Sequence, residues 1–576
     1  MNYRQFFKRF LWPHFPVYFL GILLLIAVDA LQLWVPKLLG AAIDDISLGK
    51  THLASYVGNI LLLGLAILVC KFGYRLCILG QIRKSEYLMR DAIVKKSIRL
   101  PVQFYEKHGP GKIMALLIND VTSIRIAFGL GMLLLVDTIF LNGLALWMMA
   151  SQITLALAAR VLLPMPLILL AAILLGRVVR KRFRHVQDLF SNLTEYTQEL
   201  FLGLPIIKSL VEEASVARYF ATLNEENMQG NLSLARVQAV FIPMMRILPM
   251  ICYAVSLFIC GRLVINDEIS VGDFVAINGY IGMLIMATMG VGGLIAVMNR
   301  ALGSYDRLRE YFEWPEEQTT DDCAGDRDSV PVQAKVRAEH LTFTYPEADT
   351  PALCDVNLTI PEGAFVGLVG APGSGKTTFF KLLLRLYNPP AGTLFINDKD
   401  VRSYCLEDLR ALSGFVPQEQ ILFSKTVADN ITFPAPAQEQ DMDYVQQLMD
   451  DTAISLSLQD RLQGPSSKLQ EAGTDLSGGQ RQRIGIARAL YKRAPLLLLD
   501  DVFSALDFQT AAMIEESILK LRRKYTILFI SQRIDALRDA DIIFVFKDGH
   551  IVEQGTHEEL WNRHGEYYVL YHQQEA

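Results

Sequence analysis

This 576-residue sequence has few charged residues and no C-x-x-C motif. Only 20% of the residues are Asp, Glu, Lys or Arg, whereas 52% are hydrophobic. The net charge of −5 offers no positive excess for nucleic acid, so no nucleic-acid partner is expected. The seven cysteines form no C-x-x-C pair and have no spacing typical of metal ligands. What the sequence does have is a membrane-like excess of apolar residues.

Long apolar runs fill the first 300 residues and predict a membrane domain. A helix needs about 20 apolar residues to cross a bilayer. Segments of this kind lie at about 17–39, 55–79, 127–150, 154–176, 239–262 and 273–298. The sequence therefore predicts six transmembrane helices, which contact the lipid bilayer.

The connections between these segments alternate in charge, which predicts their orientation. Basic residues precede the first segment and follow the second, fourth and sixth, as in "GRVVRKRFRH", whereas the other connections are short or acidic, as in "NDEISVGD". By the positive-inside rule the basic set is cytoplasmic. We therefore expect a multi-pass protein of the inner (cytoplasmic) membrane with both termini inside. The opening "MNYRQFFKRFLW" predicts a short helix along the membrane surface.

The two long basic connections, 81–126 and 177–238, have helix-like patterning, so we expect them to extend the membrane helices into the cytoplasm. Each contains a break suited to a short transverse helix. These breaks are the first coupling segment, "LPVQFYEKHGPGK" at 100–112, and the second coupling segment, "GLPIIKSLVEEASVARYF" at 203–220. The predicted domains are a transmembrane domain at 1–314, a polar linker at 315–330 and a soluble domain at 331–576.

Several ionisable residues lie inside the predicted membrane segments: Asp29, Asp137, Arg160 and Arg246. A charge at membrane depth is costly and needs a partner, a water-filled cavity or a route to the interface. For Asp29, Asp137 and Arg246 the sequence leaves two interpretations open, structural pairing and the lining of a substrate cavity.

The soluble domain contains a phosphate-binding motif near its start. A predicted strand at Phe365–Val369 leads into G-x-x-x-x-G-K-T at 370–377 and then into an amphipathic helix. Such a loop wraps backbone N–H groups around phosphate oxygens, and the helix N-terminus adds a favourable dipole. Lys376 is expected to reach the β- and γ-phosphates, and Thr377 to offer a hydroxyl to Mg²⁺.

Further motifs occur in a fixed order: "VPQE" with Gln418, "LSGGQRQRIGIARAL" at 476–490, and "APLLLLDD" ending in Asp500 and Asp501. Here the chain resembles the ATP-binding cassette (ABC) superfamily, as a half-transporter of the exporter type. The resemblance implies a membrane α-helical domain of six exporter-type helices, fused to an α/β P-loop ABC nucleotide-binding domain. It also implies ATP and Mg²⁺ as cofactors.

Roles follow from the resemblance for residues that match its motifs. Tyr345 in "FTY" would stack on adenine, and Thr377, Gln418 and Asp500 would surround the magnesium. Catalytic positions would be Asp500, Asp501 and Gln532. The signature "LSGGQ" would face ATP held by a second subunit, and "SALD" at 504–507 would follow the dimer seam. The residues implied to hold phosphates are Gly370, Ala371, Pro372, Gly373, Ser374, Gly375, Lys376, Thr377 and Thr378, and those of the signature are Ser477, Gly478, Gly479 and Gln480.

Two positions depart from the family pattern. The residue after Asp500 is normally Glu, which polarises the attacking water, but here it is Asp501; the residue after Ser531 is normally His but here is Gln532. Both changes affect the site built on this chain's own phosphate loop, whereas the signature is intact. This asymmetry resembles the degenerate half of heterodimeric bacterial multidrug exporters, whose partner keeps Glu and His. The alternative is a slow homodimer that functions with Asp501.

The resemblance favours ATP-driven efflux of hydrophobic or amphipathic compounds, small molecules or lipids. Three alternatives remain: a homodimeric lipid or drug exporter, an exporter-fold importer of a metal complex, and an ATP-gated channel or sensor. No added regulatory domain is recognised in the sequence, and both coupling segments are present, which favours the pump.

Overall fold

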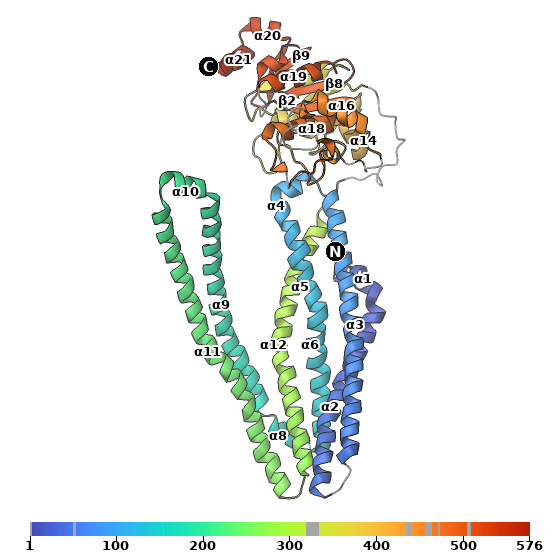
Figure 1. Ribbon diagram of the computed structural model, residues 1–576, viewed down its shortest axis with the longest axis vertical. Coiled ribbons are helices and arrows are strands. Elements are labelled where there is room, and N and C mark those ends of the chain that lie inside the picture. Colours follow the sequence, from blue (N-terminus) through green and yellow to red (C-terminus); the bar gives the residue numbers. More distant parts are fainter. Residues whose placement is uncertain are drawn as a thin grey trace. The chain divides into compact units, whose positions relative to one another are not determined.

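The computed structural model describes residues 3–49, 53–153, 155–317, 333–433, 435, 439–455, 464–470, 473–503 and 508–575. It divides into two compact units, each described by itself (Figure 1). The helical unit comprises Met1–Ile98 and Pro110–Trp314, and the sheet unit comprises Arg99–Gly109 and Pro315–Ala576. The first coupling segment therefore belongs mainly to the sheet unit, although the sequence places it between two membrane helices.

The helical unit is built from long helices joined by short turns (Figure 1). Short α- and π-helical segments, α4 to α7, follow one another from Val102 to Gln152, with a kink inside α4 at Gly109, whose φ and ψ of 63° and 164° are not helical. The elements are α1 (Tyr3–Phe10), η1 (Trp12–His14), α2 (Phe15–Ser47), α3 (Leu53–Arg99), α4 (Val102–Ala115), η2 (Leu116–Asp120), α5 (Val121–Ile126), η3 (Ala127–Gly131), α6 (Met132–Val136), η4 (Asp137–Leu141), α7 (Asn142–Gln152), α8 (Leu155–Val161), α9 (Pro164–Leu202), α10 (Leu204–Leu210), α11 (Glu213–Ile265) and α12 (Val271–Glu313).

Five helical stretches among the described residues are long and apolar enough to cross a membrane: Trp12–Ser47, Leu53–Arg99, Val102–Ser151, Glu213–Ile265 and Val271–Glu313. They coincide with five of the six predicted segments. The other segment, 154–176, is divided between α8 and the start of α9, which begins at Pro164. Proline is favoured in the first turn of a helix because its missing N–H is not needed there. The transmembrane helix predicted at 154–176 therefore stays a prediction.

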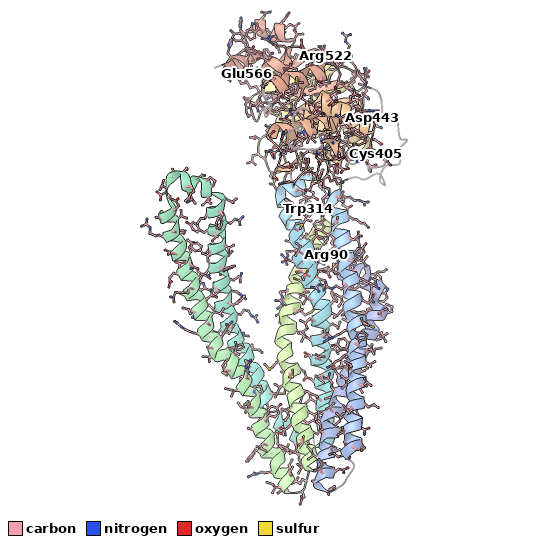
Figure 2. The ribbon with its side chains drawn as sticks, in the orientation of Figure 1. Arg90, Trp314, Cys405, Asp443, Arg522 and Glu566 are labelled. Carbon is pink, nitrogen blue, oxygen red and sulfur yellow. The ribbon has the colours of Figure 1, made fainter. Side chains whose placement is uncertain are left out.

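Ion pairs hold the end of the helical unit that carries the basic connections. Asp120 is 4% exposed, and its carboxylate accepts two hydrogen bonds from the guanidinium of Arg307, at 2.5 and 3.1 Å. Glu86, also buried, pairs with Arg83 and Arg90 at 2.9 Å each (Figure 2). Such buried carboxylates need partners because an unpaired buried charge is destabilising.

The expected N-terminal helix is present as α1. Phe6 and Phe10 lie on one of its faces and are 5% and 2% exposed. Their rings pack against Tyr305 and Phe312 of α12, with centroid distances of 5.3 and 6.2 Å. This apolar contact fixes α1 to the last long helix.

The α9 and α11 helices form a long antiparallel pair connected by α10 (Figure 1). None of the residues of α10 is buried. The side chains of Ile206, Leu210 and Val211 are 65%, 66% and 79% exposed. An apolar cluster at the tip of a helical pair is typical of an interaction surface.

The sheet unit contains a six-stranded sheet and a four-stranded sheet. Their strand orders are β10-β9-β3-β8-β7-β6 and β2-β1-β4-β5. Strands β6, β7, β8, β3 and β9 run parallel to one another, whereas β10 pairs antiparallel with β9. Strands β3, β7 and β8 are almost fully buried, as apolar strands covered on both faces must be. The strands are β1 (Val336–Phe343), β2 (Leu353–Ile360), β3 (Phe365–Gly370), β4 (Leu394–Ile396), β5 (Lys399–Asp400), β6 (Ser413–Val416), β7 (Leu496–Asp500), β8 (Thr526–Ile530), β9 (Ile542–Lys547) and β10 (His550–Gly555).

Helices of the sheet unit divide between separate apolar clusters. The α13 helix packs with both sheets, whereas α15, α16 and α18 pack together around Leu448 and Ile484. The helices are α13 (Lys376–Leu383), α14 (Leu406–Ala411), α15 (Val427–Ile431), α16 (Met442–Asp451), α18 (Gly478–Tyr491), α19 (Phe508–Leu519), α20 (His557–Arg563) and α21 (Glu566–Glu575), with 3₁₀ turns at Val401–Ser403, Gly464–Ser466 and Ile534–Leu537.

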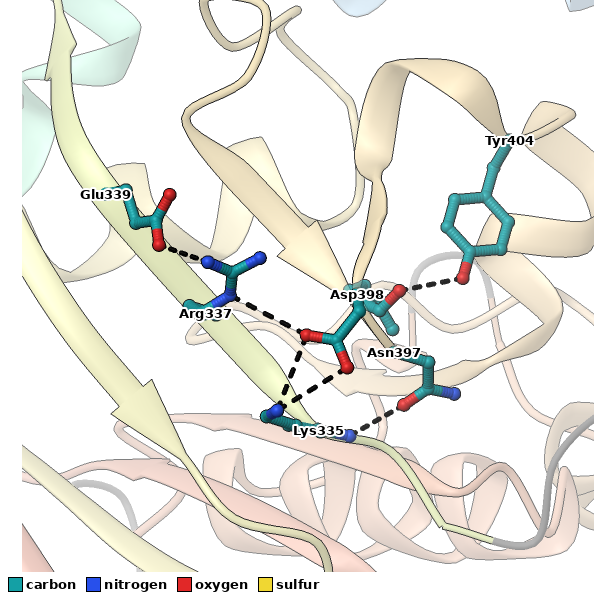
Figure 3. A network of polar contacts seen from close by, with 7 residues as sticks. Lys335, Arg337, Glu339, Asn397, Asp398 and Tyr404 are labelled. Carbon is teal, nitrogen blue, oxygen red and sulfur yellow. Dashed lines mark hydrogen bonds and ion pairs between the residues drawn. The ribbon is translucent and has the colours of Figure 1, made fainter.

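A polar network fixes the edge of the four-stranded sheet (Figure 3). Asp398, in the turn between β4 and β5, accepts from Lys335 at 3.4 Å and lies 3.7 Å from the Arg337 guanidinium. The Lys335 N–H donates to Asn397 at 2.8 Å, and Arg337 also pairs with Glu339. The network is largely exposed, so it contributes to register more than to stability.

Candidate nucleotide site

The loop after β3 has the backbone that the phosphate-binding motif requires. Gly370, Gly373 and Gly375 have φ angles of 150°, 80° and 104°, a region that side chains with a Cβ rarely adopt. A Cβ on Gly375 would also approach the carbonyl oxygen of Ala352 to 2.7 Å, and one on Gly370 would collide with the carbonyl oxygen of Phe546. The glycines therefore hold a tight turn that delivers the chain into α13.

Lys376 begins α13 and is 8% exposed. Its ammonium donates to the carbonyl oxygens of Gly370 and Ala371 at 2.7 and 2.9 Å, and to the Ser374 hydroxyl at 3.1 Å. Burial lowers the pKa of this ammonium, while the negative charges of Asp500 and Asp501 oppose that shift. A cation held inside the loop in this way is placed to meet anionic phosphate oxygens.

Two of the three predicted magnesium ligands are adjacent. The Thr377 hydroxyl donates to the Asp500 carboxylate at 3.3 Å, and Asp500, at the end of β7, is 3% exposed. Burial raises the pKa of the Asp500 carboxyl, and the hydrogen bond from Thr377 opposes that shift. Hard oxygen ligands of this kind suit Mg²⁺, so the residues fit the ion.

Gln418, the third predicted ligand, lies beside Asp501. Its amide Nε2 donates to Oδ2 of Asp501 at 3.4 Å, and the amide Nε2 of Gln532 donates to the same oxygen at 3.0 Å. The backbone of Asp501 is also fixed, since its N–H donates to Ile530 at 2.8 Å and its carbonyl accepts from Gln482 at 3.1 Å. The two positions that depart from the family pattern therefore contact each other directly.

Tyr345 lies next to the phosphate loop. Its hydroxyl is 3.0 Å from that of Thr378, and its ring meets the Tyr387 ring edge-on at a centroid distance of 4.9 Å. The Lys381 ammonium lies 5.7 Å from the Tyr345 ring centroid. Tyr345 is half-buried, which leaves part of its ring available for a contact with a base.

Sequence reasoning missed the residues that connect Tyr345 to the first coupling segment. Glu106, on the part of α4 that belongs to the sheet unit, accepts hydrogen bonds from Tyr387 and from Lys381, the latter at 3.4 Å. In the same segment Lys107 pairs with Glu347 at 3.2 Å. Tyr387 and Lys381 belong to no motif, so only their positions in the fold identify them.

The signature residues begin α18, whose residue Ile484 packs in a different apolar cluster from the one that contains α13. Ser477 caps α18: its hydroxyl accepts from the Gln480 N–H at 3.2 Å, while the Gln480 side chain accepts from the Ser477 N–H at 2.9 Å. Ser477 and Gly478 are exposed and Gly479 is half-buried. This capped, exposed helix N-terminus is the kind of surface that binds anions.

Two predicted segments lie wholly or partly outside the described residues: "SALD" at 504–507, and the linker from 318 to 330. Of the predicted linker, residues 315–317 are described, and Glu317 pairs with Arg410 at 3.0 Å.

Family models and relatives cover nearly the whole chain. The model described as ABC transporter transmembrane region matches residues 18–288, and the one described as ABC transporter matches 353–504. The probable multidrug resistance ABC transporter ATP-binding/permease protein YheI of Bacillus subtilis (strain 168) is 32% identical over 99% of this chain and 96% of its own length. The multidrug resistance-like ATP-binding protein MdlA of Escherichia coli (strain K12) is 29% identical, covering 96% and 94%. An ATP-dependent lipid A-core flippase of Photobacterium profundum is 27% identical, covering 98% and 97%.

Proposed function

The chain belongs to the ABC transporters, as an exporter with fused transmembrane and ATP-hydrolysing domains, and on that premise we propose that it is the supporting half of a heterodimeric exporter. In this proposal its own ATP site holds nucleotide and hydrolyses it poorly, while its signature completes the active site of the partner. The observation that carries the proposal is the contact of the Asp501 carboxylate with the amides of Gln418 and Gln532.

The chemistry of this contact is unfavourable for hydrolysis. The Asp501 side chain is one carbon shorter than Glu, and displacing a catalytic group by about 1 Å costs about 100-fold in rate. One of its oxygens already accepts from two amides. Gln532 is neutral at every pH and cannot take the charge that a histidine takes when it assists in proton transfer. We therefore assign Asp501 and Gln532 to the catalytic positions of a weakened site.

In this proposal a second chain completes each site. The phosphate loop leads into α13, which packs in one apolar cluster, whereas Leu476 and Ile484, on either side of the signature, pack in another, and the signature is partly exposed. The exposed apolar tip of α10 supports a docking role for the second coupling segment on the partner. We expect that partner to carry the longer acid and the histidine.

Magnesium would be held by Thr377, Asp500 and the amide oxygen of Gln418. When bound, the ion would neutralise charge on the β- and γ-phosphates. Lys376 would bind the same phosphates, and Tyr345 would stack on the adenine. The phosphate loop itself would contribute the backbone N–H groups between Gly370 and Thr378.

The transported compounds are proposed to be hydrophobic or amphipathic, because relatives are named for multidrug resistance and for lipid A-core transfer. The proposed location is a bacterial inner membrane with both termini and the ATP-binding domain in the cytoplasm, as the basic connections predict. Among the alternatives, a homodimer would need Asp501 to be catalytic, and an importer or a channel would differ in the direction or the energetics of transport.

The test compares two substitutions in a purified pair whose partner chain is unchanged. Gly478→Asp in this chain would place a side chain and a negative charge where the signature meets the partner's ATP. We expect ATP to bind at both sites while hydrolysis and transport fall together by at least about tenfold, the scale of losing one transition-state contact. Asp501→Asn should reduce hydrolysis by less than about twofold, because the acid is already misplaced.

The reverse pattern would contradict the proposal. A collapse of hydrolysis in Asp501→Asn, with Gly478→Asp near the unmodified rate, would assign catalysis to this chain's own site and favour the homodimer. Uphill uptake by inverted vesicles measures the direction of transport and separates a pump from a channel.

A further inference from the structure

Two carboxylates lie inside the transmembrane part of the helical unit, on helices far apart in sequence. Asp29 is in α2, and Asp137 begins the π-helical segment η4. The residues that precede them, Val28 and Val136, pack in one apolar cluster, and Cys70, which precedes Lys71 in α3, packs against the same cluster. Because helices rise about 1.5 Å per residue, Asp29, Asp137 and Lys71 lie roughly 12 to 18 Å from the ends of their segments that are predicted to be cytoplasmic. They therefore share a similar depth near the middle of the bilayer.

The acceptor oxygens around this pair are not satisfied by the protein. Asp29 is 3% exposed, and its Oδ2 atom is buried without a hydrogen-bond partner in the part of the chain that the structure describes. The same is true of the Thr138 hydroxyl and of the side-chain oxygen of Asn142. The Asn142 amide nitrogen donates to the Thr138 carbonyl oxygen at 2.8 Å, which turns the amide oxygen away from that contact. Unsatisfied buried acceptors are costly, above all in a membrane.

The local backbone adds a second indication. Residues Asp137–Leu141 form the last of three π-helical turns in this stretch, after Leu116–Asp120 and Ala127–Gly131, and this turn carries Asp137 and Thr138. Such turns are rare and occur frequently at functional sites, because they shift side chains off the regular helical register. This turn packs against α2 and α12. It therefore lies against α2, the helix that carries Asp29.

Charge and exposure together indicate what the group of acceptors would bind. Four side chains supply the acceptors, namely the carboxylates of Asp29 and Asp137, the Thr138 hydroxyl and the Asn142 amide oxygen, and N⁺–H donors form strong hydrogen bonds to carboxylates. Asp137, Thr138 and Asn142 are half-buried, so the group is accessible from the η4 side. A ligand that carries N–H donors therefore fits this group of acceptors.

We propose that Asp29 and Asp137 form an intramembrane binding site for the protonated amine of a transported amphipathic compound. The carboxylates, the Thr138 hydroxyl and the Asn142 amide oxygen accept hydrogen bonds from the ammonium group, and the apolar remainder lies against the surrounding helices. The site rests on the proposed export function and adds to it a substrate class, hydrophobic amines. Lys71, whose charge opposes binding of a second cation, limits the site to one.

The experiment uses the full transporter pair in lipid nanodiscs and two matched fluorescent probes. Monodansylcadaverine carries a charged ammonium group, and its N-acetylated form is neutral but otherwise similar. Binding is followed by energy transfer from the tryptophans to the dansyl group. We expect the unmodified pair to prefer the charged probe by at least about tenfold, the factor of one charge-assisted hydrogen bond.

The isosteric variants Asp29→Asn and Asp137→Asn should each remove most of this preference while leaving affinity for the neutral probe unchanged. A merely structural role would instead weaken both probes together. The matched control is Asp188→Asn, which removes one exposed carboxylate from α9 outside the site and should keep the preference. Binding of ATP, measured in parallel, verifies that each variant is folded.

Three results would overturn the inference. Equal affinity of the unmodified pair for both probes, with ATP hydrolysis stimulated by both, would leave export standing and remove the amine site. A changed pH optimum of transport in the Asn variants, with the amine preference intact, would assign the pair to a proton only. Absence of binding and of stimulation by either probe, with no uptake into inverted vesicles, would overturn the proposed function as well.

Discussion

Asp501 determines what the nucleotide site of this chain can do. Its carboxylate is buried and accepts from Gln418 at 3.4 Å and from Gln532 at 3.0 Å, so one oxygen is occupied by two neutral donors. Asp501 also has a φ of 49°, a backbone conformation that Asp tolerates better than most residues. The short acid and the amide therefore form a matched pair of substitutions, and a test of either should include both.

Restoring both family residues should restore hydrolysis at this site. The background is the pair in which Gly478→Asp in this chain has already disabled the partner's site. Adding Asp501→Glu with Gln532→His is expected to raise steady-state hydrolysis by about tenfold or more, because it repositions the carboxylate and supplies a protonatable ring. Phosphate release is the measurement.

The two single substitutions serve as controls for this double change. Each should give less than the double, since the acid and the ring would act on the same water. Hydrolysis that stays at background in the double substitution, with ATP still bound, would show that something other than these two residues limits the site.

At the scale of the element, we propose that the short helices α4 and α10 couple nucleotide binding to the membrane helices. The α4 segment reaches the nucleotide site through Glu106, which accepts from Lys381 and Tyr387, and Tyr387 in turn contacts Tyr345. If Tyr345 moves when it stacks on a base, the movement would reach α4 through the Tyr345–Tyr387 and Tyr387–Glu106 contacts. The α10 helix has no comparable contact within the described part of its own chain, since none of its residues is buried.

A charge on the tip of α10 should weaken the docking of this helix on the partner chain. Ile206 is 65% exposed, so Ile206→Asp should leave the stability of this chain nearly unchanged. If the tip docks in an apolar pocket of the partner, the charge must be desolvated, and substrate-stimulated hydrolysis should fall by about tenfold or more. Hydrolysis with and without substrate is the measurement.

The matched control is Ser209→Asp, which introduces the same charge into the exposed part of α10 without removing an apolar side chain. It should have at most a small effect. Equal losses in both variants would point to general electrostatic repulsion and against an apolar docking contact.

At the scale of the whole molecule, the two units carry different parts: one the membrane helices and the other the nucleotide-binding motifs. The helical unit supplies long apolar helices, and the sheet unit supplies the phosphate loop and the signature. The first coupling segment belongs by its contacts to the sheet unit, although the sequence inserts it between membrane helices. The boundary between the two units therefore falls within this segment, between Gly109 and Pro110.

The predicted orientation can be measured by labelling single cysteines in a background without the seven native ones. Glu268, between α11 and α12, is exposed and predicted to lie outside the cell, so Glu268→Cys should react with a membrane-impermeant maleimide in intact cells. Ser209→Cys, in the second coupling segment, should react only after permeabilisation. Labelling of Ser209→Cys in intact cells would reverse the orientation.

Local patterns by themselves determined most of the architecture. Apolar runs marked five long helical stretches that the structure confirms, and the glycine spacing at 370–377 marked the loop between β3 and α13. Such features depend on consecutive residues, because helix length, strand burial and backbone freedom are set within a few residues of the chain. The break before Pro164 is an exception: the apolar run reads as continuous, although the helix ends and restarts there.

Tertiary structure decided what distant residues do together. Lys71 lies in a different helix from Asp29 and Asp137, and only tertiary packing brings their neighbours Val28, Cys70 and Val136 into one cluster. The meeting of Gln418, Asp501 and Gln532 likewise joins residues separated by 83 and 31 positions. The sequence states which groups a chain carries, but the free energy of a carboxylate depends on the donors and charges that the fold brings within a few ångströms.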